Sequence, residues 1–154
     1  MNIVAYTMEY AGLPVKSGQI PVVQFEERYY EEYKNIYEDC FFEMRKALGL
    51  KPHNACDSLK QLLKKREDIY LLVEKSKLIG SVAICGNEID DLIVSKQFQN
   101  QGYGKKLLLF AVALLKKRDA SPITLGVAEW NQKAINLYKN NGFVVTKMET
   151  VVGA

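Results

Sequence analysis

The sequence predicts a mixed α+β fold, with a central, mostly antiparallel sheet and helices on both of its faces. Short β-branched and aromatic segments alternate with longer amphipathic ones, and an apolar helical segment at about 104–118 separates two predicted strands, 88–94 and 122–128. A helical crossover joins parallel strands, so we expect this pair to be parallel within an otherwise antiparallel sheet. The 154 residues are close to the usual size of one domain, and we predict a single domain over residues 1–154.

The N-terminal half is predicted to hold two strands and two helices. Residues 3–10 and 20–25 are β-branched and aromatic, with the loop GLPVKSG between them. Apolar residues then recur at three- and four-residue steps, which predicts a long helix over 26–48 with one apolar stripe. We expect residues 50–57 to form a loop and residues 58–66 a short helix, capped by the Asp or Ser at its start.

The C-terminal half is predicted to be richer in strands. Residues 68–95 indicate three antiparallel strands, with turns near 75–77 and at 86–87. After the helix at 104–118, the segment ITLGVA indicates a buried strand. It is followed by a helix over 131–141 and a last strand over 143–152.

Composition and charge exclude several classes of protein. A net charge of +3 is too small to indicate a nucleic-acid partner, which usually requires clustered Lys and Arg. Three cysteines without a CxxC spacing, and a single histidine, favour neither a disulfide framework nor a metal site. The N-terminal residues do not resemble a signal peptide, and no segment approaches the roughly 20 apolar residues of a membrane span. We therefore expect a cytoplasmic protein without metal, nucleic-acid or membrane partners.

One short loop gives the clearest functional signal. It lies between the strand DDLIVS and the helix KKLLLF and consists of Gln99, Asn100, Gln101, Gly102, Tyr103, Gly104 and Lys105. Glycines allow a tight turn and a close approach of ligand to backbone, and the N–H groups of a helix start suit a pyrophosphate. The P-loop and dinucleotide-binding patterns fit less well, because the glycines that they require are missing. An ordinary strand-to-helix turn is the alternative.

This loop resembles the coenzyme A motif of the GCN5-related N-acetyltransferases, Q/R-x-x-G-x-G/A, which follows a strand and opens a long helix. A second segment, VAEWNQKAINLYKNNGF, resembles the later part of the same family: a strand, an Asn, a helix with A-x-x-L-Y, and a closing G-F. The resemblance covers residues 69–149. It implies the fold of that family and the transfer of an acetyl group from acetyl-coenzyme A to a primary amine, by direct attack in a ternary complex.

The resemblance also implies the residues that bind the coenzyme. It assigns the main chain of the strand before the loop to the pantetheine arm, and the amides from Gln101 to Lys105 to the pyrophosphate. Asn131 is assigned as a coenzyme contact, and it can also be the cap of the following helix, since the two roles are compatible. The predicted coenzyme-binding residues are Ile93, Val94, Ser95, Gln99, Asn100, Gln101, Gly102, Tyr103, Gly104, Lys105 and Asn131.

For catalysis, the resemblance assigns Tyr138 as the acid that protonates the departing thiolate. The amine must also lose a proton, which calls for a base. Glu88 and Asp90 are the candidates; strand alternation places both on one face and Asp91 on the other. Glu88 lies nearest the turn, and all three acids could instead be exposed edge residues.

Two alternatives remain open at this point. The same fold could bind coenzyme A without turnover, as a sensor or assembly module, or the loop could hold another nucleotide. The resemblance implies that residues 26–57 shape the pocket for the acceptor, a small-molecule or peptide amine, and it allows a homodimer. The sequence does not identify the amine.

Overall fold

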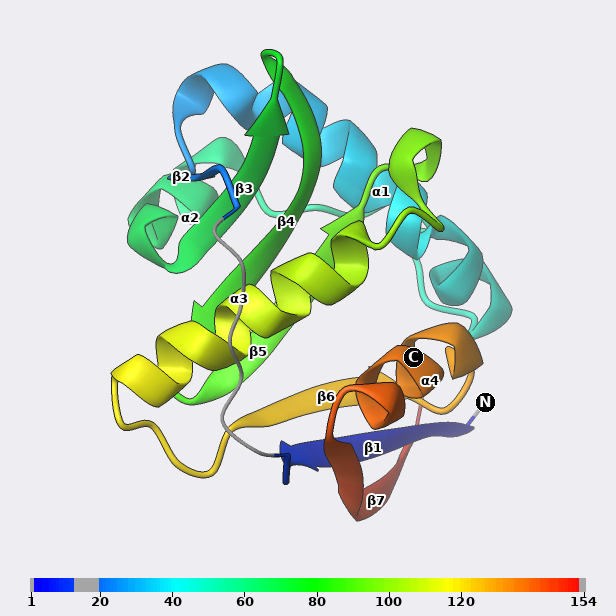
Figure 1. The fold of residues 1–154 in the computed structure, drawn as a ribbon. Helices are drawn as coiled ribbons and strands as arrows, with labels where there is room; N and C mark the ends of the chain where they lie inside the picture. The colour runs from blue at the N-terminus through cyan, green and yellow to red at the C-terminus, as the bar shows by residue number, and fades with distance from the viewer. Residues whose placement is uncertain (1, 13–19, 153–154) are drawn as a thin grey trace.

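The computed structural model describes residues 2–12 and 20–152, and it has the predicted mixed α+β architecture (Figure 1). Most of the predicted loop GLPVKSG lies outside the described residues. The strands are β1 (Asn2–Tyr10), β2 (Val22–Gln24), β3 (Ile69–Glu74), β4 (Lys77–Cys85), β5 (Glu88–Val94), β6 (Thr124–Ala128) and β7 (Phe143–Val152). The α-helices are α1 (Tyr30–Ala47), α2 (Leu59–Lys64), α3 (Tyr103–Lys117) and α4 (Gln132–Asn140).

The sheet has seven strands in the order β2-β3-β4-β5-β6-β1-β7. β5 and β6 are parallel and every other neighbouring pair is antiparallel, as the crossover through α3 predicts. The sequence does not predict the position of β1. It is the first strand of the chain, yet it lies between β6 and β7, and β2 lies at the opposite edge of the sheet.

Helices cover both faces of the sheet and create two hydrophobic cores. α3 crosses one face of β4 and β5, while α1 and α2 lie on the other face (Figure 1). The first core contains one face of α3 and reaches α4 through Ile135 and Tyr138. The second core joins Tyr33 of α1 and Leu62 of α2 to β3 and β4. In the part of the chain that the structure describes, no helix is long and apolar enough to cross a membrane.

Candidate active site

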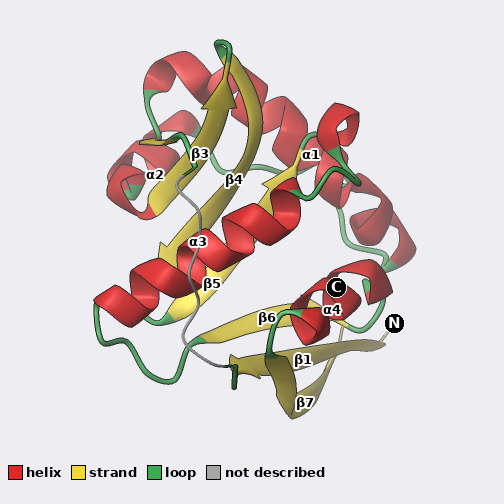
Figure 2. Ribbon diagram, viewed as in Figure 1, coloured by secondary structure: helices red, strands yellow, loops and turns green. Residues whose placement is uncertain are grey.

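Strands β5 and β6 run side by side for only two residue pairs. Glu88 pairs with Thr124 and Ile89 with Leu125, at the start of both strands. β5 continues to Val94 without a further pair to β6, and Figure 2 shows the two strands diverging. The edge of β5 that faces this divergence therefore carries main-chain groups that β6 does not use.

The end of β5 directs alternate main-chain groups to opposite sides. Ser95 N–H donates to the Ile79 carbonyl of β4 at 2.8 Å, so it is occupied within the sheet. A Cβ on Gly80 would lie 2.6 Å from the Ile93 carbonyl oxygen, which shows that this carbonyl also points towards β4. Because alternate residues of a strand direct their main chains to opposite edges, Val94 N–H faces the divergence. Among the three residues predicted to contact pantetheine, Val94 has the N–H on that side.

Gln99 ties the loop after β5 back to the strand. Its Nε2 donates to the Val94 carbonyl oxygen at 3.0 Å, and the Cys40 thiol of α1 lies 3.2 Å from the same oxygen. The motif position assigns Gln99 to the coenzyme. The structure gives its carboxamide a second task, which is to hold the loop against the last residue of β5.

The N-terminus of α3 is open to a ligand. Gly102 precedes the helix with a φ of 88°, a left-handed conformation that glycine adopts without strain, and no side chain caps this helix end. Lys106 N–H donates to the Gly102 carbonyl at 3.1 Å. The N–H groups between these two residues lie in the first turn, where an α-helix has no internal acceptors to offer. Together with the helix dipole, they form the kind of site that binds phosphate.

Two side chains of the loop form hydrogen bonds within the protein. The Tyr103 hydroxyl donates to Glu74 Oε2 at 3.3 Å, and Gln101 Nε2 donates to a carbonyl of the preceding turn at 3.3 Å. Asn100, with a φ of 64°, and Lys105 are both exposed. The loop thus presents main-chain groups, with Lys105 as a nearby positive charge.

Asn131 caps α4. Its side-chain oxygen accepts the Ala134 N–H at 3.2 Å, which confirms the capping alternative. The cap uses only the oxygen, so the amide nitrogen can still donate to a ligand. α4 also packs against the start of α3, since a Cβ on Gly104 would lie 3.5 Å from Leu137. The two motifs of the sequence, in the loop after β5 and in α4, therefore lie next to each other in the structure.

Tyr138 lies on the buried side of α4. Its side chain is 9% exposed, and its ring centroid is 6.1 Å from that of Phe143. Burial, and then the charge of Asp90, raise the pKa of Tyr138 to about 12. No residue in the described ranges forms a hydrogen bond with its hydroxyl. This phenol stays protonated at neutral pH and is available as a donor.

β5 contains a bulge at Asp91, which the sequence does not predict. The register with β4 shifts between Ser81 and Ala83, and Asp91 has a φ of 46°. Ile89 consequently packs in the core with α3, whereas Ile93 packs in the core with α1. Simple alternation along β5 therefore does not hold across Asp91. The prediction that Asp91 lies on the face opposite to Glu88 and Asp90 was based on this alternation, and it fails.

Asp91 reaches α1 from the bulge. The Tyr37 hydroxyl donates to Asp91 Oδ1 at 3.1 Å. Burial, and then the neighbouring charge of Asp90, raise the pKa of Asp91 to about 6, although the hydrogen bond from Tyr37 acts in the opposite direction. A carboxylate whose pKa lies near neutrality is suited to accept a proton during catalysis. The only feature of the sequence that could have indicated Asp91 as a base is its position directly after Asp90, as a second acid inside an apolar strand.

A pocket of about 400 Å³ opens beside Asp91, between α1 and the loop before α2. The rings of Tyr37 and Phe41 form part of its wall, with centroids 4.7 Å apart. Asp57 adds a second acid, which is paired with Lys65 at 2.8 Å. The residues that line the pocket are Tyr37, Phe41, Met44, Arg45, Ala55, Cys56, Asp57 and Asp91. Because Asp57 is already paired, the carboxylate of Asp91 beside the aromatic wall is the feature that favours a cationic ligand.

The two predicted bases have different surroundings. Asp90 contributes to the raised pKa of both Tyr37 and Tyr138, so its charge lies within reach of the pocket and of the buried phenol. Its Oδ1 also accepts the Asp91 N–H at 2.9 Å. Glu88 is exposed and lies in the paired start of β5. Asp90, Asp91 and Tyr138 thus lie around one stretch of β5. Glu88 lies at the start of β5, where the strand is paired with β6.

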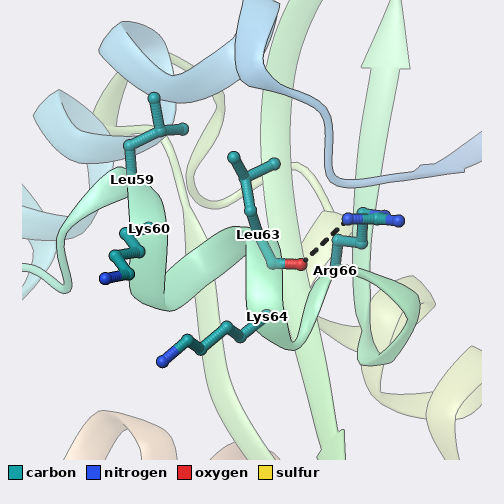
Figure 3. A pocket seen from close by; sticks show the side chains of 5 residues that line it. All are labelled: Leu59, Lys60, Leu63, Lys64 and Arg66. Carbon is teal, nitrogen blue, oxygen red and sulfur yellow. Dashed lines mark hydrogen bonds between the residues drawn. The ribbon is translucent and has the colours of Figure 1, made fainter.

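A second hollow of about 400 Å³ lies on α2 and the turn after it (Figure 3). Leu59 and Leu63 point to one side of the helix and Lys60 and Lys64 to the other, and Arg66 Nη1 donates to the Leu63 carbonyl at 3.3 Å. Its lining contains no acid and none of the predicted site residues. Within the described residues, no group of three or more His, Cys, Asp or Glu side chains could hold a metal ion.

Comparison with known proteins identifies the family of this chain. The fold and the site define an acyltransferase-type domain, with a divergent parallel strand pair beside an uncapped helix start. The family model described as "Acetyltransferase (GNAT) family" matches residues 26–143, and the chain belongs to this family.

Individual relatives are similar over shorter stretches. A mouse thialysine N-epsilon-acetyltransferase is 35% identical over 51 residues, which is 33% of this chain and 30% of the relative. The peptidyl-lysine N-acetyltransferase YjaB of Salmonella typhimurium is 31% identical over 75 residues, or 49% of this chain and 48% of the relative. The matches thus span half or less of either relative's length.

Solved structures support the fold. An acetyltransferase of the GNAT family from Colwellia psychrerythraea superimposes with a TM-score of 0.71 at 12% identity. The superposition covers 97% of this chain and 55% of that one.

Proposed function

We propose that this protein transfers an acetyl group from acetyl-coenzyme A to a primary amine of a small molecule or peptide, by direct attack within a ternary complex. The observation that carries the proposal is the arrangement around β5. Its open edge ends at the uncapped start of α3, against which α4 with Tyr138 packs, and Asp91 with its pocket lies against α1.

The residues present fit acetyl-coenzyme A. The α3 N-terminus and Lys105 would hold the pyrophosphate, since main-chain N–H groups and a positive charge converge there without a capping side chain. Val94 N–H, on the open edge of β5, would bind the pantetheine arm or the thioester oxygen. The amide nitrogen of Asn131 is a further donor. When bound, the coenzyme supplies the acetyl group as a reactive thioester.

The pocket beside Asp91 fits an amine acceptor. At neutral pH an alkylamine is mostly protonated, and the carboxylate of Asp91 would attract that cation. Asp91, with a pKa of about 6, would then accept the proton that the amine must lose before it can attack. The names of the mouse and Salmonella relatives specify thialysine and peptidyl-lysine. We include an acceptor of this amine class in the proposal.

Tyr138 would act on the leaving group. Its pKa of about 12 is well above that of an ordinary thiol, so the phenol would stabilise the departing thiolate by donating a hydrogen bond to it, while keeping its own proton. Asp90, whose charge raises this pKa, keeps Tyr138 protonated and ready to donate.

Calorimetric titration with acetyl-coenzyme A, with ATP and NAD as controls, tests the binding part of the proposal. We expect acetyl-coenzyme A to bind with a micromolar dissociation constant, and ATP and NAD not to bind. The affinity for acetyl-coenzyme A should fall at least tenfold in Gly102→Glu, where a carboxylate would repel the phosphates. Gly86→Glu is the matched control, because Gly86 also has a positive φ and open space around its Cβ position, but lies in the β4–β5 turn. No binding by the folded wild-type protein would refute the proposal.

A coenzyme A-binding module without turnover is the second candidate. The protonated Tyr138 and the raised pKa of Asp91 favour turnover, because neither property is needed for binding alone. An assay of a panel of alkylamines separates the two candidates. Tight binding of acetyl-coenzyme A without acetylation of any amine would favour the module.

A further inference from the structure

Arg45 is a charged residue of the pocket beside Asp91 to which the proposed reaction gives no task. It lies in the last turn of α1, is half-buried, and lines the same hollow of about 400 Å³ as Asp91. A charged group in a pocket wall loses part of its hydration, so it requires hydrogen-bond partners in exchange. The partners that Arg45 has within the protein therefore show what is left for a ligand.

The protein uses only one nitrogen of the Arg45 guanidinium. Nε donates to the Pro52 carbonyl oxygen at 2.7 Å, which holds the side chain against the loop that follows α1. Across residues 2–12 and 20–152, no hydrogen bond or ion pair involves either terminal nitrogen of Arg45. These two nitrogens form a planar fork that matches a carboxylate with two parallel bonds. An anchored fork of this kind is suited to bind a carboxylate of a ligand.

The unpaired charges of the pocket are one negative and one positive. Asp57 is paired with Lys65 at 2.8 Å, and burial raises the pKa of the Cys56 thiol to about 11, so this thiol is neutral at pH 7. Asp91 and Arg45 take part in no ion pair among the residues that the structure describes. A ligand with an ammonium at one end and a carboxylate at the other would neutralise both charges.

About two turns of α1 separate the two charges. Tyr37, Phe41 and Arg45 follow one another at four-residue steps, so they line one face of the helix. The Tyr37 hydroxyl donates to Asp91, which places the acid at the N-terminal end of this row. The backbones of Tyr37 and Arg45 are about 12 Å apart along the helix axis, and Phe41 and Met44 give the pocket an apolar wall. An aliphatic chain as long as the side chain of lysine, with a hydrogen bond of about 2.8 Å at each end, fits a span of this size.

We propose, on the basis of the acetyl transfer proposed above, that the acceptor is an ω-amino carboxylate. This is a small molecule in which an aliphatic chain joins a primary amine to a carboxylate. The amine end lies at Asp91, which attracts the ammonium and takes up its proton. The carboxylate end bonds to the two terminal nitrogens of Arg45. Arg45 thus determines specificity from the end of the pocket that is remote from the reacting amine.

The same guanidinium disfavours amines of other kinds. A diamine of the same length would bring its second ammonium against Arg45, and like charges repel strongly in a partly buried site. A chain that ends in a carboxamide would present a neutral group and lose the attraction between opposite charges. A lysine inside a peptide lacks the free carboxylate in the same way. We therefore expect the amino carboxylate to be preferred over the amino carboxamide, and both over the diamine.

Acetylation of three amines of matched length tests the proposal: ε-aminocaproate, its carboxamide and hexamethylenediamine. For the wild type we expect kcat/KM for ε-aminocaproate to exceed that for the carboxamide on the order of tenfold. In Arg45→Gln, which lacks the charge, this ratio should fall to about twofold or less. Arg66→Gln is the matched control, because Arg66 also donates to a main-chain carbonyl, at 3.3 Å, but lies outside the pocket. Its ratio should equal that of the wild type.

Two results of this assay would overturn the proposal. One is an equal kcat/KM of the wild-type protein for ε-aminocaproate and its carboxamide, a comparison that does not depend on the folding of any variant. The other is an Arg45→Gln variant, shown to be folded by circular dichroism, that keeps the wild-type ratio.

Calorimetry separates this proposal from the proposed function. Each amine is titrated into the protein saturated with coenzyme A, which carries no acetyl group, so that binding is measured without turnover. We expect ε-aminocaproate to bind on the order of tenfold more tightly than its carboxamide. This preference without acetylation of any amine would refute the proposed function and support recognition by Arg45. Acetylation of all three amines without such a preference would support the proposed function and refute recognition by Arg45.

Discussion

At the scale of single residues, the buried carboxylate of Asp91 lowers the stability of the folded protein at neutral pH and also serves as the proposed base. Its pKa is raised to about 6, so the folded protein binds a proton there more tightly than the unfolded chain. The folded state therefore gains stability as the pH falls from about 6 to about 4, and above about pH 6 the penalty for the buried charge is fully present. Asp91→Asn removes this charge, and Asn tolerates a positive φ. We expect its free energy of unfolding to rise at pH 7, on the order of 2 kcal/mol.

The same substitution should lower kcat/KM by about 10²-fold or more, because the base is lost. The wild-type rate should fall below about pH 6, where Asp91 becomes protonated. Urea unfolding at pH 7 and near pH 4, together with a pH–rate profile, measures both effects. Asp119→Asn is the control, since Asp119 is exposed and also has a positive φ, of 55°. A less stable Asp91→Asn at pH 7, or one with the full wild-type rate, would contradict this account.

Tyr138→Phe should separate activity from stability. In the described structure the hydroxyl has no hydrogen-bond partner, so its removal leaves no orphaned group, and we expect a change in unfolding free energy within about 0.5 kcal/mol. The turnover number should fall about 10²-fold, while acetyl-coenzyme A still binds. Steady-state kinetics and calorimetry on the same preparation give both values. An unchanged turnover number would remove Tyr138 from the proposed mechanism.

At the scale of elements, Gly142 is a position where an added side chain would meet both backbone strain and close neighbours. It follows α4 with a φ of 92°, and an added Cβ would lie 2.9 Å from the Tyr10 ring and 3.2 Å from the Gly12 backbone. Its carbonyl accepts the Ala11 N–H at 2.7 Å, which joins the end of β1 to the start of β7. We expect Gly142→Ala to lower the free energy of unfolding by about 3 kcal/mol or more.

Gly86→Ala is the matched comparison for that prediction. Gly86 has a similar positive φ of 63°, but nothing lies within 4 Å of its Cβ position. Only the backbone strain remains, on the order of 1 kcal/mol. Thermal or urea unfolding of both variants measures the difference, and equal losses would show that steric contact at Gly142 is unimportant.

Most elements follow from local sequence. The helix after residue 57 is an example: Ser58 accepts the Gln61 N–H, and the Gln61 side chain accepts the Ser58 N–H, which is the capping box that its sequence indicates. The bulge in β5 does not follow in this way. It depends on how β4 and α1 pack on both sides of the strand, and strand periodicity contains no information about such packing.

At the scale of the whole molecule, two parts of the sheet meet at β5 and β6 through only two residue pairs. A ligand that fills the divergence and contacts α3 and α4 would bind the folded state alone. We therefore expect saturating acetyl-coenzyme A, at about 100 times its dissociation constant, to add about 2.7 kcal/mol of stability. The melting temperature should rise by about 5–10 °C. Differential scanning fluorimetry measures this shift, with Gly102→Glu as the control, whose shift should be about half as large or smaller because its affinity is at least tenfold lower.

The sequence by itself determined the helices and strands, the parallel pair, the family and the two motifs around the proposed coenzyme site. Each of these depends on local periodicity, on turn residues, or on short motifs whose spacing is fixed by a neighbouring helix. Tertiary structure decided the place of β1 between β6 and β7, the reach of Asp91 to Tyr37, and the exposure of β7. These features arise from contacts between segments far apart in the chain. Their free energy depends on packing across the whole sheet, which no local pattern records.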